Sequence, residues 1–225
     1  MSLTFDLRGH ARSDGRNDTV SREDNLRDVL AAYDALVARP GVDRDAIAAV
    51  GSSYGGYLAA ILTSLRPVRW LGLRVPALYK DEGWARPKRS LDREELAAYR
   101  RRHVRPEEDR ALAACAAFEG DVLLVESEHD EVVPHPAVAS YRAAFGKARS
   151  LTYRVIEGAD HGLSEGRWQR AYTTLLVHWA TEMVLGAREG GGAQRAGSPP
   201  DEGHPGPAEP GEEVLEEAAR LGGHG

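Results

Sequence analysis

A serine at the tip of a tight turn is the first feature of this sequence that could do chemistry. The Gly-x-Ser-x-Gly motif of residues 51–55 follows a short apolar run and precedes a helical pattern of small and apolar residues. This order predicts a strand at 46–50, a turn with Ser53 at its tip, and a helix. Gly51 and Gly55 are expected to let the helix pass close to the strand without a Cβ clash. The Ser53 hydroxyl would then stand above the first turn of the helix, where it can act as a nucleophile.

Two more residues with suitable chemistry follow other predicted strands. Apolar runs at 121–126 and 151–156 predict buried strands, and Asp130 and His161 come shortly after them. Because the carboxyl ends of parallel strands meet at one edge of a sheet, we expect both residues near Ser53. A serine hydroxyl needs an adjacent base, histidine titrates near neutral pH, and a carboxylate orients the imidazole. The sequence therefore predicts a catalytic triad of Ser53, Asp130 and His161.

Neighbouring residues offer weaker alternatives to each member of this triad. Ser52 adjoins the nucleophile but is not at the centre of the motif, so we interpret it as structural. Asp160 precedes His161 directly, which points its carboxylate away from the ring and favours a loop or capping role. His129 and His135 flank the acid, but their spacing is not that of zinc ligands. We predict no metal and no cofactor.

The elements that must position these residues alternate between strand and helix patterns. This alternation predicts the α/β class, with a mainly parallel sheet and helices on both faces. Strands are predicted at 3–7, 46–50, 69–75, 121–126 and 151–156, and helices at 21–38, 54–65, 91–102, 106–118, 135–145 and from 165 onward. Ser21 is the expected N-cap of the first helix, with Asp24 as its capping-box partner. The last helix carries a stripe that predicts a core-docked face: Trp168, Tyr172, Leu175, Leu176, Trp179, Met183 and Val184.

Two segments depart from the alternation. Residues 76–118 begin with a charged stretch that contains proline and continue with two helical patterns. We interpret them as a helical insertion, which is either a small lid over the site or an ordinary crossover connection. Residues 187–225 are rich in glycine, proline and glutamate, and a disordered tail is predicted there. The folded domain is therefore expected at 1–186.

Composition excludes several classes of protein. The 225 residues carry a net charge of −6, which argues against a nucleic-acid-binding protein. The single cysteine, Cys115, excludes an intramolecular disulfide and is expected to be a small buried residue. The sequence shows no apolar leader and no stretch long enough to span a membrane, so a cytoplasmic protein without membrane contact is expected.

Three sequence blocks together resemble the α/β-hydrolase superfamily. They are Gly-Ser-Ser-Tyr-Gly-Gly-Tyr at 51–57, Glu-His-Asp-Glu-Val-Val-Pro at 128–134 and Gly-Ala-Asp-His-Gly at 158–162. The Tyr-Gly-Gly-Tyr continuation is similar to the prolyl-oligopeptidase and acylaminoacyl-peptidase branch and to dienelactone-hydrolase-like esterases. Phe-Asp-Leu-Arg-Gly-His at 5–10 resembles the strand and loop that many members carry upstream of the serine. The resemblance covers residues 3 to 186.

This resemblance implies a role for each site residue. Ser53 would be the nucleophile, His161 the base, Asp130 the orienting acid, and the backbone N–H of Tyr54 an oxyanion donor. Members of the superfamily usually carry further strands upstream, one of them followed by the loop that gives a second oxyanion donor. The sequence is therefore expected to give an N-terminally shortened α/β-hydrolase fold whose open sheet edge favours self-association.

The function expected from the sequence is hydrolysis of small carboxylic esters through an acyl-enzyme. An amide or peptide hydrolase of the prolyl-oligopeptidase type is the alternative enzyme. A hydrolase-like interaction protein with impaired catalysis is the alternative outside enzymes.

Overall fold

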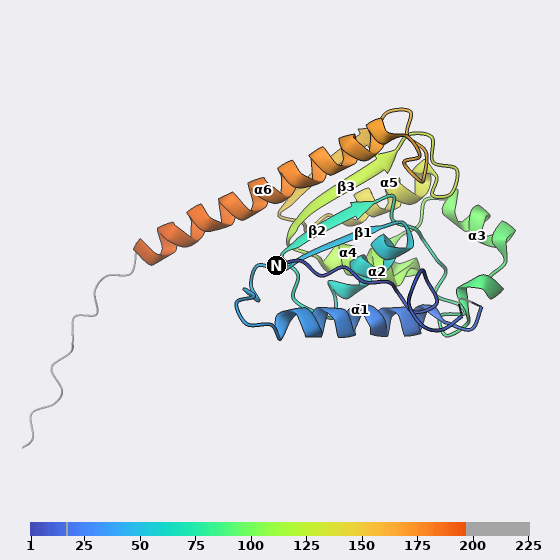
Figure 1. Cartoon of the computed structure of the whole chain (residues 1–225). Coiled ribbons are helices and arrows are strands. Elements are labelled where there is room, and N and C mark those ends of the chain that lie inside the picture. The colour runs from blue at the N-terminus through green and yellow to red at the C-terminus, as the bar shows by residue number, and fades with distance from the viewer. Residues whose placement is uncertain (17, 197–225) are drawn as a thin grey trace, which may run out of the picture. The chain divides into compact units, whose positions relative to one another are not determined.

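Four parallel strands form the sheet of the computed structural model, which describes residues 1–16 and 18–196. The strands are β1 (Ala48–Ser52), β2 (Trp70–Arg74), β3 (Asp121–Ser127) and β4 (Ser150–Ile156), paired side by side in that order (Figure 1). Ser52 pairs with Arg74, and Arg74 with Val125, so the carboxyl ends of these strands lie at the same edge. The predicted α/β class and parallel sheet are confirmed.

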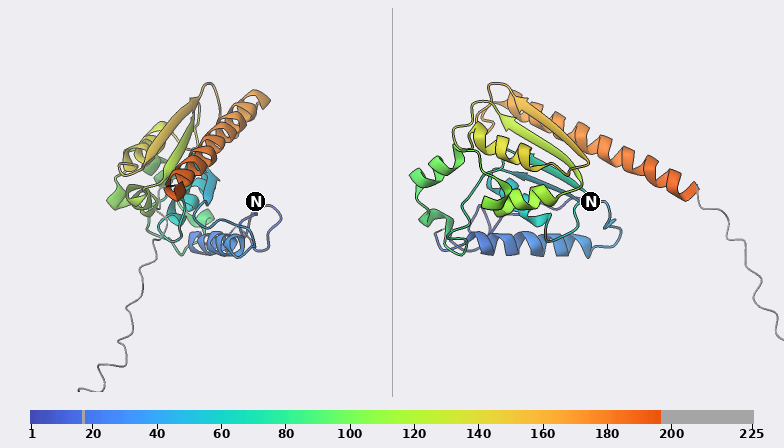
Figure 2. Two further views of the ribbon diagram at one scale, coloured as in Figure 1. Left: turned by 90° about the vertical axis from the view of Figure 1, so that its left-hand side faces the viewer. Right: turned by 180° about the vertical axis from the view of Figure 1, so that it is seen from behind.

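Helices cover both faces of this sheet. One face carries α1 (Arg22–Val37), α2 (Tyr54–Leu62), α4 (Arg110–Ala117) and α5 (His135–Ala144). The other carries the part of α6 (Gly166–Ala196) that ends at Gly186 (Figures 1 and 2). A further helix, α3 (Arg93–Arg100), belongs to the connection between β2 and β3, which also contains the 3₁₀ turns Lys88–Ser90 and Pro106–Glu108. The chain divides into two units, Met1–Gly186 and Ala187–Gly225, and the sheet belongs to the first.

The first helix begins where the sequence predicts it. Ser21 Oγ accepts a hydrogen bond from the Asp24 N–H at 3.1 Å, and Asp24 Oδ2 accepts one from the Ser21 N–H at 3.1 Å. These two bonds satisfy N–H groups at the helix start that would otherwise lack partners. The side chain of the next residue, Arg22, is fully buried and donates to the carbonyls of Lys80 and Glu82. The start of α1 is thereby fixed to the segment that follows β2.

The core lies between the sheet and the helices α2, α4 and α5. Every residue of β3 is buried, which is typical of a parallel strand covered on both faces. Leu112 and Cys115 of α4 are fully buried in this core, and Cys115 is the expected small buried residue. Because α4 is a core helix, a lid role could concern only the part of the insertion before it.

Residues 3–7 are not a strand, which corrects the prediction. No described strand lies beside them, and the outer edge of β1 is open. An isolated extended segment gains no ladder hydrogen bonds, so its apolar pattern alone does not make it a strand. Leu3 and Phe5 are each 46% exposed and, together with Leu7, line an apolar groove of about 300 Å³ beside β1.

The last helix differs from its prediction in two respects. Of the predicted stripe only Trp179 is buried, while Val184 is 39% exposed. Leu176 does reach the sheet, since a Cβ on Gly72 of β2 would lie 3.7 Å from its Cδ1. The helix also continues through residues 187–196, the first part of the segment where a disordered tail is predicted. No proline occurs between residues 187 and 198, and Ala, Arg, Glu and Gln favour a helix, although the glycines at 190–192 do not. The rest of the predicted tail, 197–225, lies outside the described residues.

No helix among the described residues is both long enough and apolar enough to cross a membrane.

Candidate active site

Ser53 occupies a strained position between β1 and α2. Its φ of 52° and ψ of −118° lie in a region that residues with a Cβ rarely adopt. Two backbone hydrogen bonds hold it there: the Ser53 N–H donates to the Arg74 carbonyl at 2.9 Å, and the Ala77 N–H donates to the Ser53 carbonyl at 3.0 Å. The end of β2 and the residues after it therefore hold the turn in place.

Of the two glycines predicted to allow a close approach near Ser53, only Gly51 has that role. A Cβ on Gly51 would lie 2.4 Å from the Gly55 carbonyl oxygen, so a side chain cannot be accommodated there without a backbone shift. A Cβ on Gly55 would meet nothing within 4 Å. A Cβ on Gly56 would lie 3.1 Å from the Pro76 Cα. Gly51 therefore allows β1 to pass close to the start of α2, and Gly56 allows α2 to pass close to Pro76. The expectation for Gly55 is corrected.

Asp130 and His161 form a hydrogen-bonded pair at the same edge of the sheet. The distance between His161 Nδ1 and Asp130 Oδ2 is 2.7 Å. The other oxygen, Asp130 Oδ1, accepts the N–H groups of Val132 and Val133 at 2.9 and 2.7 Å. The Asp130 side chain is 2% exposed, whereas that of His161 is 26% exposed. A buried, fixed carboxylate thus orients an imidazole whose Nε2 is left to interact with another group.

The hydroxyl of Ser53 is not yet bonded to this imidazole. Within the described part of the chain, Ser53 Oγ makes no hydrogen bond, and the residue is only half-buried. Hydrogen bonds between catalytic groups are often long before substrate binds and tighten in the complex. The arrangement thus places a strained serine after β1 and an oriented histidine after β4, at the same edge of the sheet but with β2 and β3 between their strands.

The alternative residues are occupied elsewhere. Asp160 Oδ1 accepts the Ser164 N–H at 2.9 Å, so this carboxylate caps the start of the following segment. His135 Nδ1 lies 2.8 Å from Glu126 Oε1, away from the Asp130 pair. Ser52 is exposed at the end of β1.

Tyr54 is held by residues that the sequence pattern did not single out. Its hydroxyl donates to Asn25 Oδ1 at 3.0 Å, its ring stacks on His10, and Lys88 Nζ lies 3.8 Å from the ring centroid. Burial raises the pKa of the Tyr54 hydroxyl, and burial lowers the pKa of Lys88 to about 8. The backbone N–H of Tyr54 lies in the first turn of α2, where N–H groups lack intrahelical acceptors. These contacts fix the first residue after Ser53.

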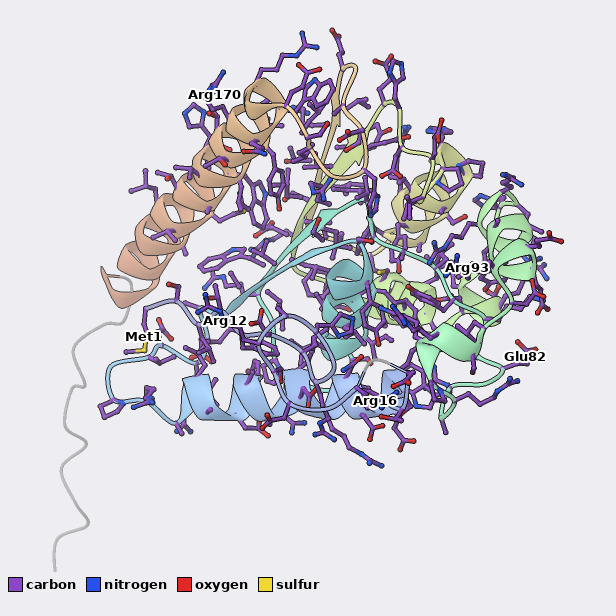
Figure 3. The ribbon with its side chains drawn as sticks, turned by 45° about the vertical axis from the view of Figure 1, so that its right-hand side comes forward. Met1, Arg12, Arg16, Glu82, Arg93 and Arg170 are labelled. Atoms are coloured by element: carbon purple, nitrogen blue, oxygen red, sulfur yellow. The ribbon has the colours of Figure 1, made fainter. Side chains whose placement is uncertain are left out.

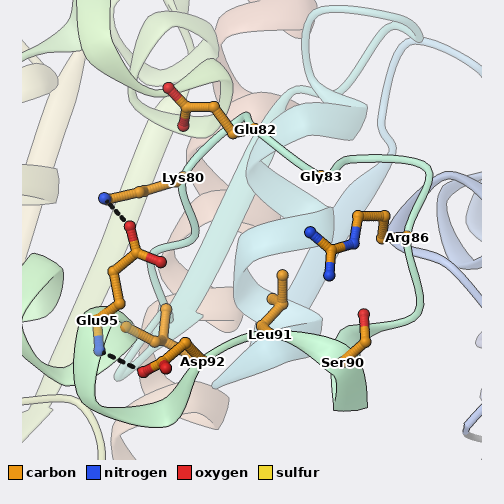
Figure 4. Close-up of a pocket in the computed structure, with 9 residues that line it drawn as sticks. Lys80, Glu82, Gly83, Arg86, Ser90, Leu91, Asp92 and Glu95 are labelled. Carbon is orange, nitrogen blue, oxygen red and sulfur yellow. Dashed lines mark hydrogen bonds and ion pairs between the residues drawn. The ribbon is translucent and has the colours of Figure 1, made fainter.

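A charged pocket of about 380 Å³ lies in the insertion, formed by residues between Lys80 and Leu96 (Figure 4). Lys80 pairs with Glu95 at 2.5 Å, and Arg86 projects toward the pocket. Glu82 and Arg93 lie on the side of the domain that carries α3 (Figure 3). None of the three predicted triad residues lines this pocket. It is therefore separate from the candidate site.

Comparisons with known proteins identify the fold that carries these residues. Residues 13–73, which include α1, β1 and the serine turn, match the model of the prolyl oligopeptidase family. Solved structures share the fold over most of the chain, among them an alpha-beta serine hydrolase homologue from Coxiella burnetii. That structure has 21% identity and a TM-score of 0.51, covering 76% of this chain and 65% of its own. The chain has the α/β-hydrolase fold.

Two further α/β-hydrolase structures differ in size. Monoacylglycerol lipase from Paleococcus ferrophilus is 16% identical with a TM-score of 0.57, over 79% of this chain and 82% of the lipase. Acylaminoacyl peptidase from Pyrococcus horikoshii is 18% identical with a TM-score of 0.50, over 73% of this chain and 29% of the peptidase. No curated protein matches the sequence. The predicted resemblance to the α/β-hydrolases and their prolyl oligopeptidase branch is confirmed.

Proposed function

We propose that this protein is a serine hydrolase that cleaves small carboxylic esters through an acyl-enzyme intermediate. The observation that carries the proposal is the buried Asp130, hydrogen-bonded to His161 at the sheet edge where Ser53 stands in its strained turn. A carboxylate bonded to Nδ1 leaves Nε2 as the acceptor for the serine proton. Ser53, His161 and Asp130 are the nucleophile, base and orienting acid of this mechanism.

The proposed reaction proceeds in two half-reactions. Ser53 Oγ attacks the ester carbonyl carbon while His161 Nε2 takes the hydroxyl proton, and the tetrahedral intermediate forms. The intermediate collapses as the C–O bond to the alcohol breaks and His161 returns the proton to the leaving oxygen. Water then attacks the acyl-enzyme in the same way, which releases the acid and restores Ser53.

The backbone N–H of Tyr54 is the oxyanion donor in this proposal. Its place in the first turn of α2 directs an unpaired donor and the positive end of the helix dipole toward Ser53. One oxyanion donor contributes about 3 kcal/mol to transition-state stabilisation.

Esters are favoured over amides as substrates. An alkoxide leaves more readily than an amine, so ester cleavage is the easier reaction for this triad. The match to the prolyl oligopeptidase family supports the alternative, an amide or peptide hydrolase. Ser53 Oγ has no hydrogen-bond partner among the residues that the structure describes, which supports the other alternative, an interaction protein with impaired catalysis.

A substrate panel separates these three functions. We expect p-nitrophenyl acetate and butyrate to be hydrolysed faster than aminoacyl p-nitroanilides, with all turnover lost in Ser53→Ala. Ser52→Ala is the matched control and should retain activity, because that exposed side chain lies outside the proposed triad. Faster Ser53-dependent cleavage of the anilides would assign a peptidase instead. Turnover by folded wild-type protein no higher than by Ser53→Ala would contradict an enzyme of either kind.

A further inference from the structure

The last residue of β2 places a buried cation beside the candidate site. Arg74 is 8% exposed, and its guanidinium donates from one nitrogen to the His161 carbonyl at 2.9 Å and to Ser127 Oγ at 3.5 Å. The guanidinium carbon lies 5.7 Å from the centroid of the Tyr172 ring. A strand residue is thus bonded to the loop that carries the base, although 87 residues separate the two in sequence.

This cation has no ion pair among the described residues. No carboxylate oxygen there lies within 4.0 Å of the Arg74 guanidinium. Burial lowers the pKa of Arg74, while the more distant charges of Asp130 and Asp160 act in the opposite direction. An unpaired buried charge costs folding free energy, and an apolar side chain of similar size would avoid that cost. The hydrogen bond to the His161 carbonyl is therefore the closest interaction that compensates this charge.

The same residue also holds the nucleophile. The Arg74 carbonyl accepts the Ser53 N–H at 2.9 Å, so its backbone binds one site residue and its side chain binds the loop of another. The other bonds that fix this loop lead toward β3, lead to α6 through Gln169 Nε2 and the Leu163 carbonyl at 2.9 Å, or stay within the loop. The His129 N–H donates to the Ala159 carbonyl at 2.9 Å, and the Gly158 N–H donates to Glu128 at 2.7 Å. Among the described residues, Arg74 provides the bond that ties His161 to the nucleophile's side of the sheet.

We propose that Arg74 is a positioning residue that sets the distance between Ser53 and His161 by binding both. The inference rests on the proposed function of these two residues. Ser53 Oγ makes no hydrogen bond in the described part of the chain, so the reach of His161 depends on where its loop is held. A displacement of about 1 Å between reacting groups can cost about a hundredfold in rate.

Replacing Arg74 should therefore lower kcat and leave KM nearly unchanged. We expect Arg74→Met to reduce kcat for p-nitrophenyl butyrate about 10- to 100-fold, with KM within about twofold of the wild-type value. Arg74→Lys keeps the charge and one donor, so it should retain more activity than Arg74→Met. Ser127→Ala removes only the longer contact and is the matched control, with kcat close to that of the wild type.

Chemical rescue of kcat by added guanidinium separates a positioning role of the Arg74 side chain from a general role in stability. Arg74→Ala leaves space where the guanidinium was, and added guanidinium chloride at millimolar concentration should restore part of its kcat. The same salt should not restore Arg74→Met, whose side chain fills the space. Sodium chloride at equal ionic strength is the control. Equal response of both variants to the two salts would overturn the proposed role.

Hydrogen–deuterium exchange tests the inference independently of catalysis. Loss of the Arg74 bond should speed amide exchange about tenfold in residues 157–164 of Arg74→Met, with β3 unchanged. A variant that unfolds would show faster exchange in β3 as well, and Arg74→Lys would then be compared with the wild type instead. An inactive wild type would contradict the proposed function, and exchange in 157–164 would still decide the role of Arg74. The proposed role of Arg74 is overturned if folded Arg74→Met has the kcat of the wild type, or if its residues 157–164 exchange at the wild-type rate.

Discussion

Asp130→Asn is expected to lower kcat for ester hydrolysis about 10,000-fold while the protein stays folded. The amide keeps the shape of the carboxylate and an oxygen for the N–H groups of Val132 and Val133. Its NH₂ group, however, would face His161 Nδ1 at the position of an acceptor that lies 2.7 Å away. The imidazole would then turn or change tautomer, and Nε2 would no longer accept the serine proton. Steady-state kinetics with p-nitrophenyl butyrate measure the loss.

Asp160→Asn provides the matched control for this prediction. Asp160 adjoins His161 in sequence, but its carboxylate binds Ser164 rather than the imidazole. We expect its kcat to remain within about threefold of the wild-type value, because this exposed cap contributes only about 1 kcal/mol to local stability. Equal losses in the two variants would show that a general loss of negative charge, not the Asp130–His161 bond, lowers activity.

Gly51→Ala is expected to destabilise the domain by about 3 kcal/mol and to abolish activity. The new Cβ would lie 2.4 Å from the Gly55 carbonyl oxygen and 2.7 Å from the Gly56 nitrogen. Both neighbours are backbone atoms at the start of α2, so the helix would have to move away from the strand. Ser53 would move with it, because the turn joins these two elements. Urea unfolding followed by circular dichroism measures the free energy of unfolding.

Gly55→Ala is the control and should have the opposite sign. A Cβ there meets nothing within 4 Å, and alanine in a helix is more stable than glycine by roughly 0.5–1 kcal/mol. We expect a small gain in the free energy of unfolding and retained esterase activity. Similar destabilisation by both substitutions would contradict the assignment of the close approach to Gly51.

Local sequence patterns predict most of the elements that form the site. The motif around Ser53 and the apolar runs before Asp130 and His161 predict three strand ends, and parallel pairing brings such ends to one edge. The capping box at Ser21 is also a local signal, and α1 begins there. These predictions succeed because each depends on residues close together in the chain.

The features that depend on distant contacts could not be predicted in this way. The apolar pattern of residues 3–7 gives no strand, because a strand requires a neighbour and β1 is not paired with it. Gly55 and Gly56 look equivalent in sequence, yet only Gly56 lies close to Pro76. Arg74 reads as an ordinary strand residue, and its bond to His161 spans 87 positions. These contacts join residues that are far apart in the sequence, so they become visible only in the folded structure.

Covalent labelling tests the central claim, that Ser53 is an activated nucleophile, most directly. Incubation of the folded full chain with a fluorophosphonate, followed by intact mass measurement and peptide mapping, should show a single adduct on Ser53. Ser53→Ala should show none, and Asp130→Asn should be labelled far more slowly than Asp160→Asn. Folded wild-type protein that stays unlabelled, or an adduct on Ser52 in place of Ser53, would contradict the account.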